Sequence, residues 1–232
     1  MALKPFDDND IPDAIEFLAQ WVRRPAAVGA ILPSGKSLAQ AMARQVDVNR
    51  AGLVLDLGGG TGTITKACIE MGVDPHSIVV LEKAPSFCSL IRERFPEARV
   101  IRGDARNLQT LMEVRGIGPF KAVLSSLPLL SIPETQRNRI LAQVFEVLDQ
   151  DGVFVQFTYG PLSPVPRCIT RSLELVKDRS AWVLRNVPPA SVWRYSRAGG
   201  RLDLRGPHVP SPAIQADAQQ ARQAMESIQA VE

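Results

Sequence analysis

Short, mostly apolar runs alternate with helical stretches along most of the chain. Each run is typical of a strand in a buried sheet. Strands are expected near 53–57, 78–82, 99–102, 121–126 and 152–158. Between these runs, apolar residues recur every three to four positions, which predicts helices. The helices are expected near 62–71, 84–94 and 135–148.

Two more strands are expected near 181–187 and 191–197, separated only by Val187-Pro-Pro-Ala190. A connection this short cannot contain a parallel crossover, so the two strands must be antiparallel. Asp151-Gly152 is expected to form the turn into the fifth strand. The pattern predicts an α/β fold with a seven-stranded, mostly parallel sheet and a C-terminal antiparallel hairpin.

The first predicted strand ends in a glycine loop, Gly58-Gly-Gly-Thr-Gly62. Asp56 lies at the end of the strand, and Glu82 closes the second strand 20 residues beyond Gly62. A glycine turn lets a ligand approach the backbone, and an acid at this distance can bind the hydroxyls of a ribose. The sequence therefore predicts a nucleoside cofactor.

The glycine spacing indicates which cofactor. Dinucleotide sites have the pattern G-x-G-x-x-G, whereas here the third glycine is Gly62 and position 63 is Thr. The pattern G-x-G-x-G after an acidic strand end resembles the class I S-adenosylmethionine-dependent methyltransferases. Gly103-Asp-Ala105, after the third apolar run, matches the adenine-binding acid of that family.

The resemblance implies S-adenosylmethionine as the cofactor. It implies that the glycine loop, the strand-end acids and their neighbours bind it. The expected cofactor-binding residues are Asp56, Gly58, Gly59, Gly60, Gly62, Thr63, Glu82, Lys83, Gly103, Asp104, Ala105 and Ser125.

Composition limits the other classes of function. The chain has 232 residues, 45% of them hydrophobic, which is enough for one α/β domain with a proper core. No run approaches the ~20 apolar residues of a membrane span, and the N-terminus lacks the pattern of a signal peptide. A cytoplasmic protein is expected. Cys68, Cys88 and Cys168 share no metal-ligand spacing, so they are expected to be small core hydrophobes and no metal site is expected.

The stretch 11–24 predicts an amphipathic helix with aromatic residues and a basic end. Such a helix can lie in the interface of a bilayer. The alternative is that it packs over the cofactor site as a lid. The residues expected to meet the membrane are Phe17, Leu18, Trp21, Arg23 and Arg24.

Charge is unevenly distributed near the C-terminus. The net charge of the chain is only +3, but residues 161–205 contain nine Lys or Arg and three acids. Such a region suits an anionic lipid surface or a nucleic acid, or it is simply a solvated face. We divide the chain into an N-terminal helix and substrate lid (1–35), a methyltransferase domain (36–205) and a C-terminal tail (206–232).

Four segments outside the cofactor motifs are more specific. They are residues 29–38, 125–133, 156–164 and 188–195, which include Pro-Ser-Gly-Lys, Leu-Pro-Leu-Leu and Thr-Tyr-Gly-Pro. Together they look like the bacterial phospholipid N-methyltransferases, which convert phosphatidylethanolamine to phosphatidylcholine. The similarity covers roughly residues 10–197. It implies peripheral association with the inner face of the cytoplasmic membrane through the N-terminal helix, with phosphatidylethanolamine and an anionic lipid surface as partners and no nucleic acid or obligate protein partner.

The expected catalytic residues are Tyr159, Ser126 and Leu127. The loop after the fourth strand contains no His and no acid, so backbone carbonyls are expected to orient the amine there. The proton of the amine is expected to pass to water or to the hydroxyl of Tyr159.

The expected headgroup site combines aromatic and basic side chains. Tyr159, Trp193 and Tyr195 can hold a methylated ammonium through cation–π contact, although Trp193 and Tyr195 also fit a role as ordinary core residues. Basic side chains and a hydroxyl are expected at the lipid phosphate. These are Ser34, Lys36, Arg24 and Arg194.

Two other functions remain open. Adenine N6-methyltransferases acting on ribosomal RNA share the cofactor motifs, but they place Asn-Leu-Pro-Tyr or Asn-Pro-Pro-Tyr after the fourth strand. Here the stretch is Ser126-Leu-Pro-Leu129, without the amide and the aromatic ring that would hold an adenine. A noncatalytic S-adenosylmethionine- or lipid-binding scaffold is the second alternative, and the intact acids argue against it.

Overall fold

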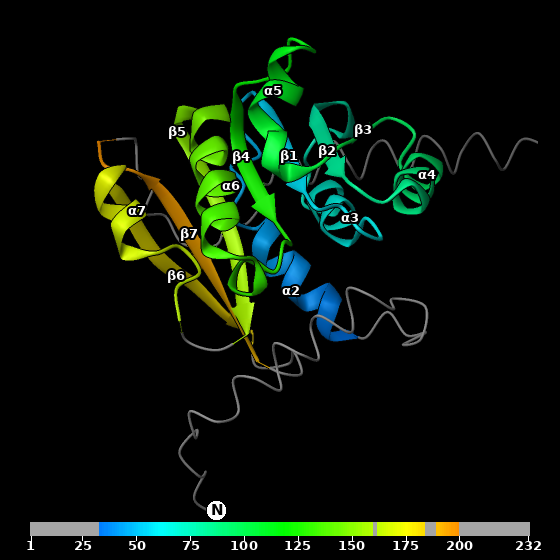
Figure 1. The fold of residues 1–232 in the computed structure, drawn as a ribbon. Coiled ribbons are helices and arrows are strands. Elements are labelled where there is room, and N and C mark those ends of the chain that lie inside the picture. The colour runs from blue at the N-terminus through cyan, green and yellow to red at the C-terminus, as the bar shows by residue number, and fades with distance from the viewer. Residues whose placement is uncertain (1–32, 160–161, 184–188, 200–232) are drawn as a thin grey trace, which may run out of the picture. The chain divides into compact units, whose positions relative to one another are not determined.

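A computed structural model describes residues 33–159, 162–183 and 189–199, all within one unit of the chain, Met1–Leu202. They form a seven-stranded sheet in the order β3-β2-β1-β4-β5-β7-β6 (Figure 1). The first five strands pair in parallel, and β7 is antiparallel to both β5 and β6. The predicted fold class is confirmed. The strands are β1 Leu53–Leu57, β2 Ile78–Glu82, β3 Arg99–Arg102, β4 Phe120–Ser125, β5 Leu148–Tyr159, β6 Leu175–Val183 and β7 Ala190–Arg197.

Helices cover both faces of the sheet, and a separate hydrophobic cluster fills each side (Figure 1). We call these sides the α2 face and the α6 face. The helices on the α2 face are α2 Pro33–Ala43, α3 Thr63–Glu70 and α4 Pro85–Arg94. Those on the α6 face are α5 Leu108–Glu113, α6 Glu134–Val147 and α7 Arg167–Ser172.

The central strands could be predicted because both of their faces are buried. Every residue of β2 and of β4 is buried. A strand covered on both sides is apolar almost throughout, which makes it visible as a continuous run. The apolar positions alternate between the two clusters: Val54 and Val80 pack on the α2 face, and Leu55 and Val79 on the α6 face.

Two strands differ from the prediction. β6 was expected at 181–187 but runs over Leu175–Val183, and residues 184–188 lie outside the described residues. It is an edge strand with four consecutive exposed residues, 176–179, so it lacks the expected alternation. The predicted turn at Asp151-Gly152 lies inside β5, where the pairing with β4 shifts register between Leu148 and Val153. The turn residues therefore form an irregularity within a longer strand.

Several segments were not predicted or cannot be compared. The short helices α5 and α7 were not expected, nor was α2, which begins at Pro33 and spans the proposed boundary between residues 35 and 36. The predicted amphipathic helix at 11–24 and the tail 206–232 lie outside the described residues. Among the helices that are described, none is long and apolar enough to span a membrane.

The three cysteines do not share one environment. Cys68 and Cys88 are buried, as expected for small core hydrophobes, and burial raises the pKa of both thiols. Cys168 lies in α7 and is exposed, so its prediction as a core residue is wrong. The α7 helix contacts the core mainly through Ile169, and the neighbouring position faces outward.

Candidate functional site

The glycine loop, residues 58–62, joins β1 to α3 in a space too small for side chains. A Cβ added at Gly59 would lie 2.3 Å from Cγ1 of Val80. Gly62 has a φ of 79°, and its Cβ would lie 2.6 Å from Cε2 of Phe95. Glycine is required at both positions by the close packing of the loop against β2 and α4. The loop backbone is therefore the surface that a ligand meets.

Asp56 is the buried acid beneath this loop. It is 1% exposed, and its Oδ2 accepts hydrogen bonds from the backbone N–H of Thr65 (3.1 Å) and from the Thr65 hydroxyl (2.6 Å). Burial raises the pKa of Asp56 from 3.8 to about 6, although both hydrogen bonds from Thr65 act in the opposite direction. Its Oδ1 is buried with no hydrogen-bond partner among the described residues. A bound cation or donor at the loop would satisfy this atom.

Glu82, the last residue of β2, connects through its carboxylate to the loop after β1 and to the start of α4. Its Oε2 accepts the backbone N–H of Gly60 at 2.9 Å, and its Oε1 accepts that of Ala84 at 2.7 Å. A carboxylate oxygen can accept more than one hydrogen bond, so both oxygens retain capacity for ligand hydroxyls. The predicted ribose acid is thus held rigidly by the glycine loop and by the start of α4.

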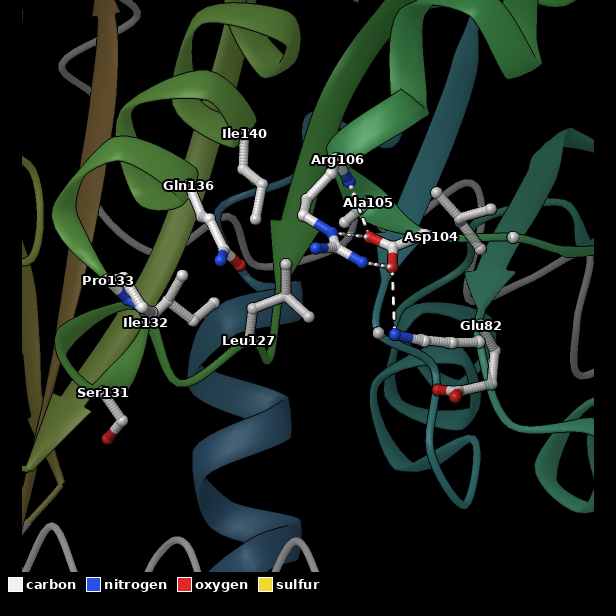
Figure 2. Close-up of a pocket in the computed structure, with 14 residues that line it drawn as sticks. Glu82, Asp104, Ala105, Arg106, Leu127, Ser131, Ile132, Pro133, Gln136 and Ile140 are labelled. Atoms are coloured by element: carbon white, nitrogen blue, oxygen red, sulfur yellow. Dashed lines mark hydrogen bonds and ion pairs between the residues drawn. The ribbon is translucent and has the colours of Figure 1, made fainter.

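Asp104 lies across the same site, at the end of β3. Its Oδ2 pairs with Nζ of Lys83 at 3.0 Å and with the Arg106 guanidinium at 2.7 Å. Its Oδ1 accepts hydrogen bonds from Nε and from the backbone N–H of Arg106, each at 3.0 Å. These bonds, chiefly those from the Arg106 side chain, hold the pKa of Asp104 well below its usual range. Figure 2 shows Arg106 and Asp104 facing one another at the cavity wall.

Glu82 and Asp104 lie in the wall of a cavity of about 330 Å³ at the carboxyl ends of the parallel strands. That is the edge where ligands bind in open α/β sheets. Glu82 and Asp104 supply polar groups, and Leu127 and Ile140 supply apolar surface opposite them (Figure 2). Its lining is Gly58, Leu81, Glu82, Lys83, Gly103, Asp104, Ala105, Arg106, Leu127, Ser131, Ile132, Pro133, Gln136 and Ile140.

The residues present fit S-adenosylmethionine. The crowded glycine loop presents backbone alone, and beneath it the Oδ1 of Asp56 is a buried acceptor without a partner among the described residues. Glu82 and Asp104, which the sequence predicts to bind the ribose hydroxyls and the adenine amine, both line the cavity. The structure brings six predicted cofactor residues to the cavity wall, together with the predicted catalytic Leu127. The six are Gly58, Glu82, Lys83, Gly103, Asp104 and Ala105. Gly59, Gly60, Gly62 and Thr63 lie in the same loop and at the start of α3.

The loop after β4 is fastened directly to the glycine loop. The Ser126 hydroxyl donates to the carbonyl of Gly58, and the Ser126 N–H donates to the carbonyl of Leu57. The N–H of Leu127 donates to Oγ of Ser125 at 3.3 Å. The loop is therefore a fixed wall between the cofactor cavity and the next strand.

The predicted aromatic site is not assembled as expected. Tyr195 is fully buried on the α6 face, stacks on Phe154 at 5.8 Å and pairs with the Ser163 hydroxyl at 2.8 Å. Burial raises the pKa of Tyr195 to about 12. Its prediction as a headgroup contact is corrected: it is a core residue. Trp193 is half-buried on the same face, and its Nε1 donates to Oγ1 of Thr158 at 3.1 Å.

Tyr159 lies on the opposite side of the sheet from Trp193. It is half-buried against the α2-face cluster, edge-on to Phe157 at 5.5 Å. The three aromatics predicted to act together are thus divided by the sheet, and none of them lines the cavity that the described residues form. The division follows from the register of the strands. Tyr159 lies four residues after Val155 on β5, so both side chains face the α2 side. Trp193 pairs with Gln156, whose side chain faces the opposite side.

The predicted phosphate-binding residues are only partly described. Lys36 is exposed on the first turns of α2, and Arg194 is half-buried on β7 opposite Val155. Ser34 lies in α2, but its side chain, like the whole of Arg24, is outside what the structure describes. A joint phosphate site therefore stays a prediction.

The site residues missed from the sequence include three that support the site and six on the cavity wall, which are Leu81, Ser131, Ile132, Pro133, Gln136 and Ile140. Arg106 fixes Asp104, Thr65 fixes Asp56, and Gln156 contacts the loop after β4. Arg106 follows Asp104 by two residues, a spacing typical of a local turn contact, whereas Gln156 is recognisable only once β5 is paired with β4. In the described part of the chain, no group of three metal-binding side chains is found.

Comparison with known proteins gives consistent matches. A family model described as a methyltransferase domain matches residues 54–152. The ornithine lipid N-methyltransferase of Singulisphaera acidiphila is 31% identical over 186 residues, which are 78% of this chain and 94% of that protein. A ribosomal RNA small subunit methyltransferase A of Chlorobaculum parvum is 33% identical over 93 residues, covering 40% of this chain and 32% of that one. The solved 1,6-didemethyltoxoflavin-N1-methyltransferase of Burkholderia thailandensis shares the fold, with a TM-score of 0.58 at 16% identity over 85% of this chain and 94% of that chain.

Proposed function

Because the chain belongs to the class I S-adenosylmethionine-dependent methyltransferases, we propose that it methylates the amine of phosphatidylethanolamine. The mono- and dimethyl forms are further substrates, and phosphatidylcholine is the end product. S-adenosylmethionine is the cofactor, bound in the cavity between the glycine loop, Glu82 and Asp104. The phospholipid as substrate is our inference.

The observation that carries the proposal is the extent of the match to a lipid N-methyltransferase. It covers 78% of this chain and 94% of that relative, so it extends well beyond the cofactor motifs at 54–105. The match to the ribosomal RNA enzyme covers only 40% of the chain. The loop after β4 also lacks a surface for a base: Leu129 is 2% exposed, and the Ser126 hydroxyl is bonded to Gly58.

For this reaction, the protein has mainly to align the lipid nitrogen with the methyl group. The bound cofactor supplies an electrophilic methyl group on a sulfonium. The lone pair of the neutral lipid nitrogen would form the new N–C bond as the S–C bond breaks and leaves its electron pair on sulfur. After the first and second transfers the nitrogen would lose a proton to water, and after the third it would be a quaternary ammonium with no proton to lose. The loop at Ser126 and Leu127, fixed by its hydrogen bonds, would hold the amine in line with the methyl group.

We place the protein at the inner face of the cytoplasmic membrane. The helix that the sequence predicts at 11–24, carrying Phe17 and Trp21, supplies the apolar contact in this proposal. The described surface offers a second contact: Trp182 on β6 is 47% exposed, and the Arg179 guanidinium lies 4.9 Å from its ring centre. Exposed Arg167, Arg171 and Lys177 lie on the adjoining α7 and β6.

A transfer assay tests the proposal. The protein is incubated with radiolabelled S-adenosylmethionine and either phosphatidylethanolamine vesicles, phosphatidylcholine vesicles or ribosomal RNA. The Glu82→Ala variant provides the blank. We expect label in lipid extracted from phosphatidylethanolamine vesicles alone. Label in RNA would favour the nucleic-acid alternative, and cofactor binding without any transfer would favour a noncatalytic scaffold.

The ornithine lipid relative favours a second candidate substrate. Vesicles containing ornithine lipid are therefore included in the same assay. Transfer to ornithine lipid with none to phosphatidylethanolamine would replace the phospholipid by this second lipid and leave lipid N-methylation in place.

A further inference from the structure

Asp104 is fully engaged by hydrogen-bond donors of the protein itself. An ionised carboxylate offers about four lone-pair sites, shared between its two oxygens. The backbone N–H and Nε of Arg106 both donate to Oδ1, each at 3.0 Å. The Arg106 guanidinium at 2.7 Å and Nζ of Lys83 at 3.0 Å both lie at Oδ2 (Figure 2). Every acceptor site of this carboxylate is therefore occupied.

Glu82, in the wall of the same cavity, is different. Among the described residues, each oxygen of Glu82 accepts one backbone N–H, from Gly60 and from Ala84. Glu82 thus keeps acceptor sites for the hydroxyls of a ligand. Asp104 can accept the adenine amine only if one of its present donors leaves. The predicted ribose side of the cavity is open, and the predicted adenine side is closed by the protein's own cations.

Lys83 is the donor that Asp104 holds most weakly. The Lys83 side chain is 73% exposed and reaches Asp104 with a single contact at the end of a flexible stem. Arg106 holds Asp104 through the fork of its guanidinium and through its backbone N–H. The Arg106 side chain is also the main cause of the lowered pKa of Asp104, to which Lys83 contributes less. A single exposed ion pair is worth little, so Lys83 is the partner that can leave.

We infer that Lys83 competes with the adenine amine of the cofactor for Oδ2 of Asp104, and that Lys83 leaves this oxygen when the cofactor binds. The role rests on Asp104 being the adenine site, as in the proposed function, and not on which lipid is methylated. The amine and the ammonium are both donors, so they need the same acceptor and exclude one another. Lys83 therefore lowers the affinity for the cofactor, while Arg106 keeps Asp104 in place.

The competition can be separated from a general effect of charge. A ligand without the amine leaves the pair between Lys83 and Asp104 intact, so the removal of Lys83 gives this ligand no advantage. A ligand with the amine no longer has to break the ion pair once Lys83 is removed. The ratio of the two affinities, which is the preference for the amine, isolates the competition from any other contact that Lys83 makes with the ligand.

Calorimetric titration measures this preference with S-adenosylhomocysteine and its deamino analogue, in which hydrogen replaces the adenine amine. Lys83→Met removes the charge, and because Lys83 is exposed it opens no cavity in the core. Lys66→Met is the matched control: Lys66 is 57% exposed and pairs with Glu70 on α3 at 3.8 Å, so the net charge changes equally. We expect Lys83→Met to raise the preference for the amine roughly 2- to 5-fold, as an exposed ion pair predicts, and Lys66→Met to leave it unchanged.

Salt gives a second readout, this time with the wild-type protein. Raising the salt from about 0.05 M to about 0.5 M screens an exposed ion pair. We expect the wild-type preference for the amine to rise toward that of Lys83→Met, whose own preference should stay the same.

A preference that Lys83→Met leaves unchanged or lowers would overturn the inference. If neither wild type nor Lys83→Met prefers the amine, the adenine role of Asp104 fails, and the inference fails with it. The titrations need no lipid, so a failure to methylate phosphatidylethanolamine would count against the proposed function alone.

Discussion

Asp56 should make the fold less stable as the pH rises. Its carboxyl has a pKa of about 6 in the folded protein against 3.8 ordinarily, because burial penalises the charged form. Between these values the folded state keeps a proton that the unfolded chain has lost, so stability falls as pH increases and stays low above about pH 6. The interval is about two pH units, each worth about 1.4 kcal/mol, which gives about 3 kcal/mol in total.

The Asp56→Asn variant isolates this effect because it cannot ionise. Its amide oxygen still accepts from Thr65, and its amide nitrogen replaces the unpartnered Oδ1 at a cost that does not depend on pH. Urea unfolding of both proteins, followed by circular dichroism, gives the difference in unfolding free energy at each pH. We expect this difference to move in favour of the variant by about 2.4 kcal/mol between pH 4 and pH 7, because the unfolded carboxyl is already more than half ionised at pH 4. A difference that stays constant over this range would refute the reasoning.

Three other predictions concern the cofactor, the glycine loop and the membrane. Glu82→Ala should weaken S-adenosylhomocysteine binding roughly tenfold to a hundredfold in calorimetry; the exposed Glu97→Ala is the control, and equal affinities would contradict the assignment. Gly62→Ala should destabilise the fold by roughly 1–3 kcal/mol more than Gly72→Ala in thermal unfolding. Both positions have positive φ, but an added Cβ at Gly72 meets no described atom within 4 Å. A chain lacking residues 1–24 should bind cofactor yet lose sedimentation with anionic vesicles; if it still pellets, the basic surface of α7 and β6 is the better candidate.

The parts of the fold that could be predicted are those in which local sequence and burial agree. β1 and β2 are apolar because both faces are covered, and the glycine loop is recognisable because close packing excludes other residues there. β6 was misplaced because an edge strand need not be apolar, so its charged residues look like a loop.

The same argument separates the residues of the site. Glu82 and Asp104 could be predicted because each ends a strand at the ligand edge of a parallel sheet. The failure of Tyr195 and the importance of Gln156 both depend on which strands pair and in which register. A one-residue change of register moves a side chain to the other face, so no local pattern could decide between pocket and core.

The positive charge on both edge strands has a consequence for how neighbouring copies of the protein interact. β3 exposes Arg99 and Arg102, and β6 exposes Lys177 and Arg179, so both outer edges of the sheet carry positive charge. An edge strand has unpaired backbone groups that invite strands from other molecules, and like charges there oppose such pairing. On the lipid surface proposed above, the protein would meet its own copies at high local concentration. Its charged margins would keep those copies apart as separate molecules while leaving the carboxyl ends of the inner strands open to their ligands.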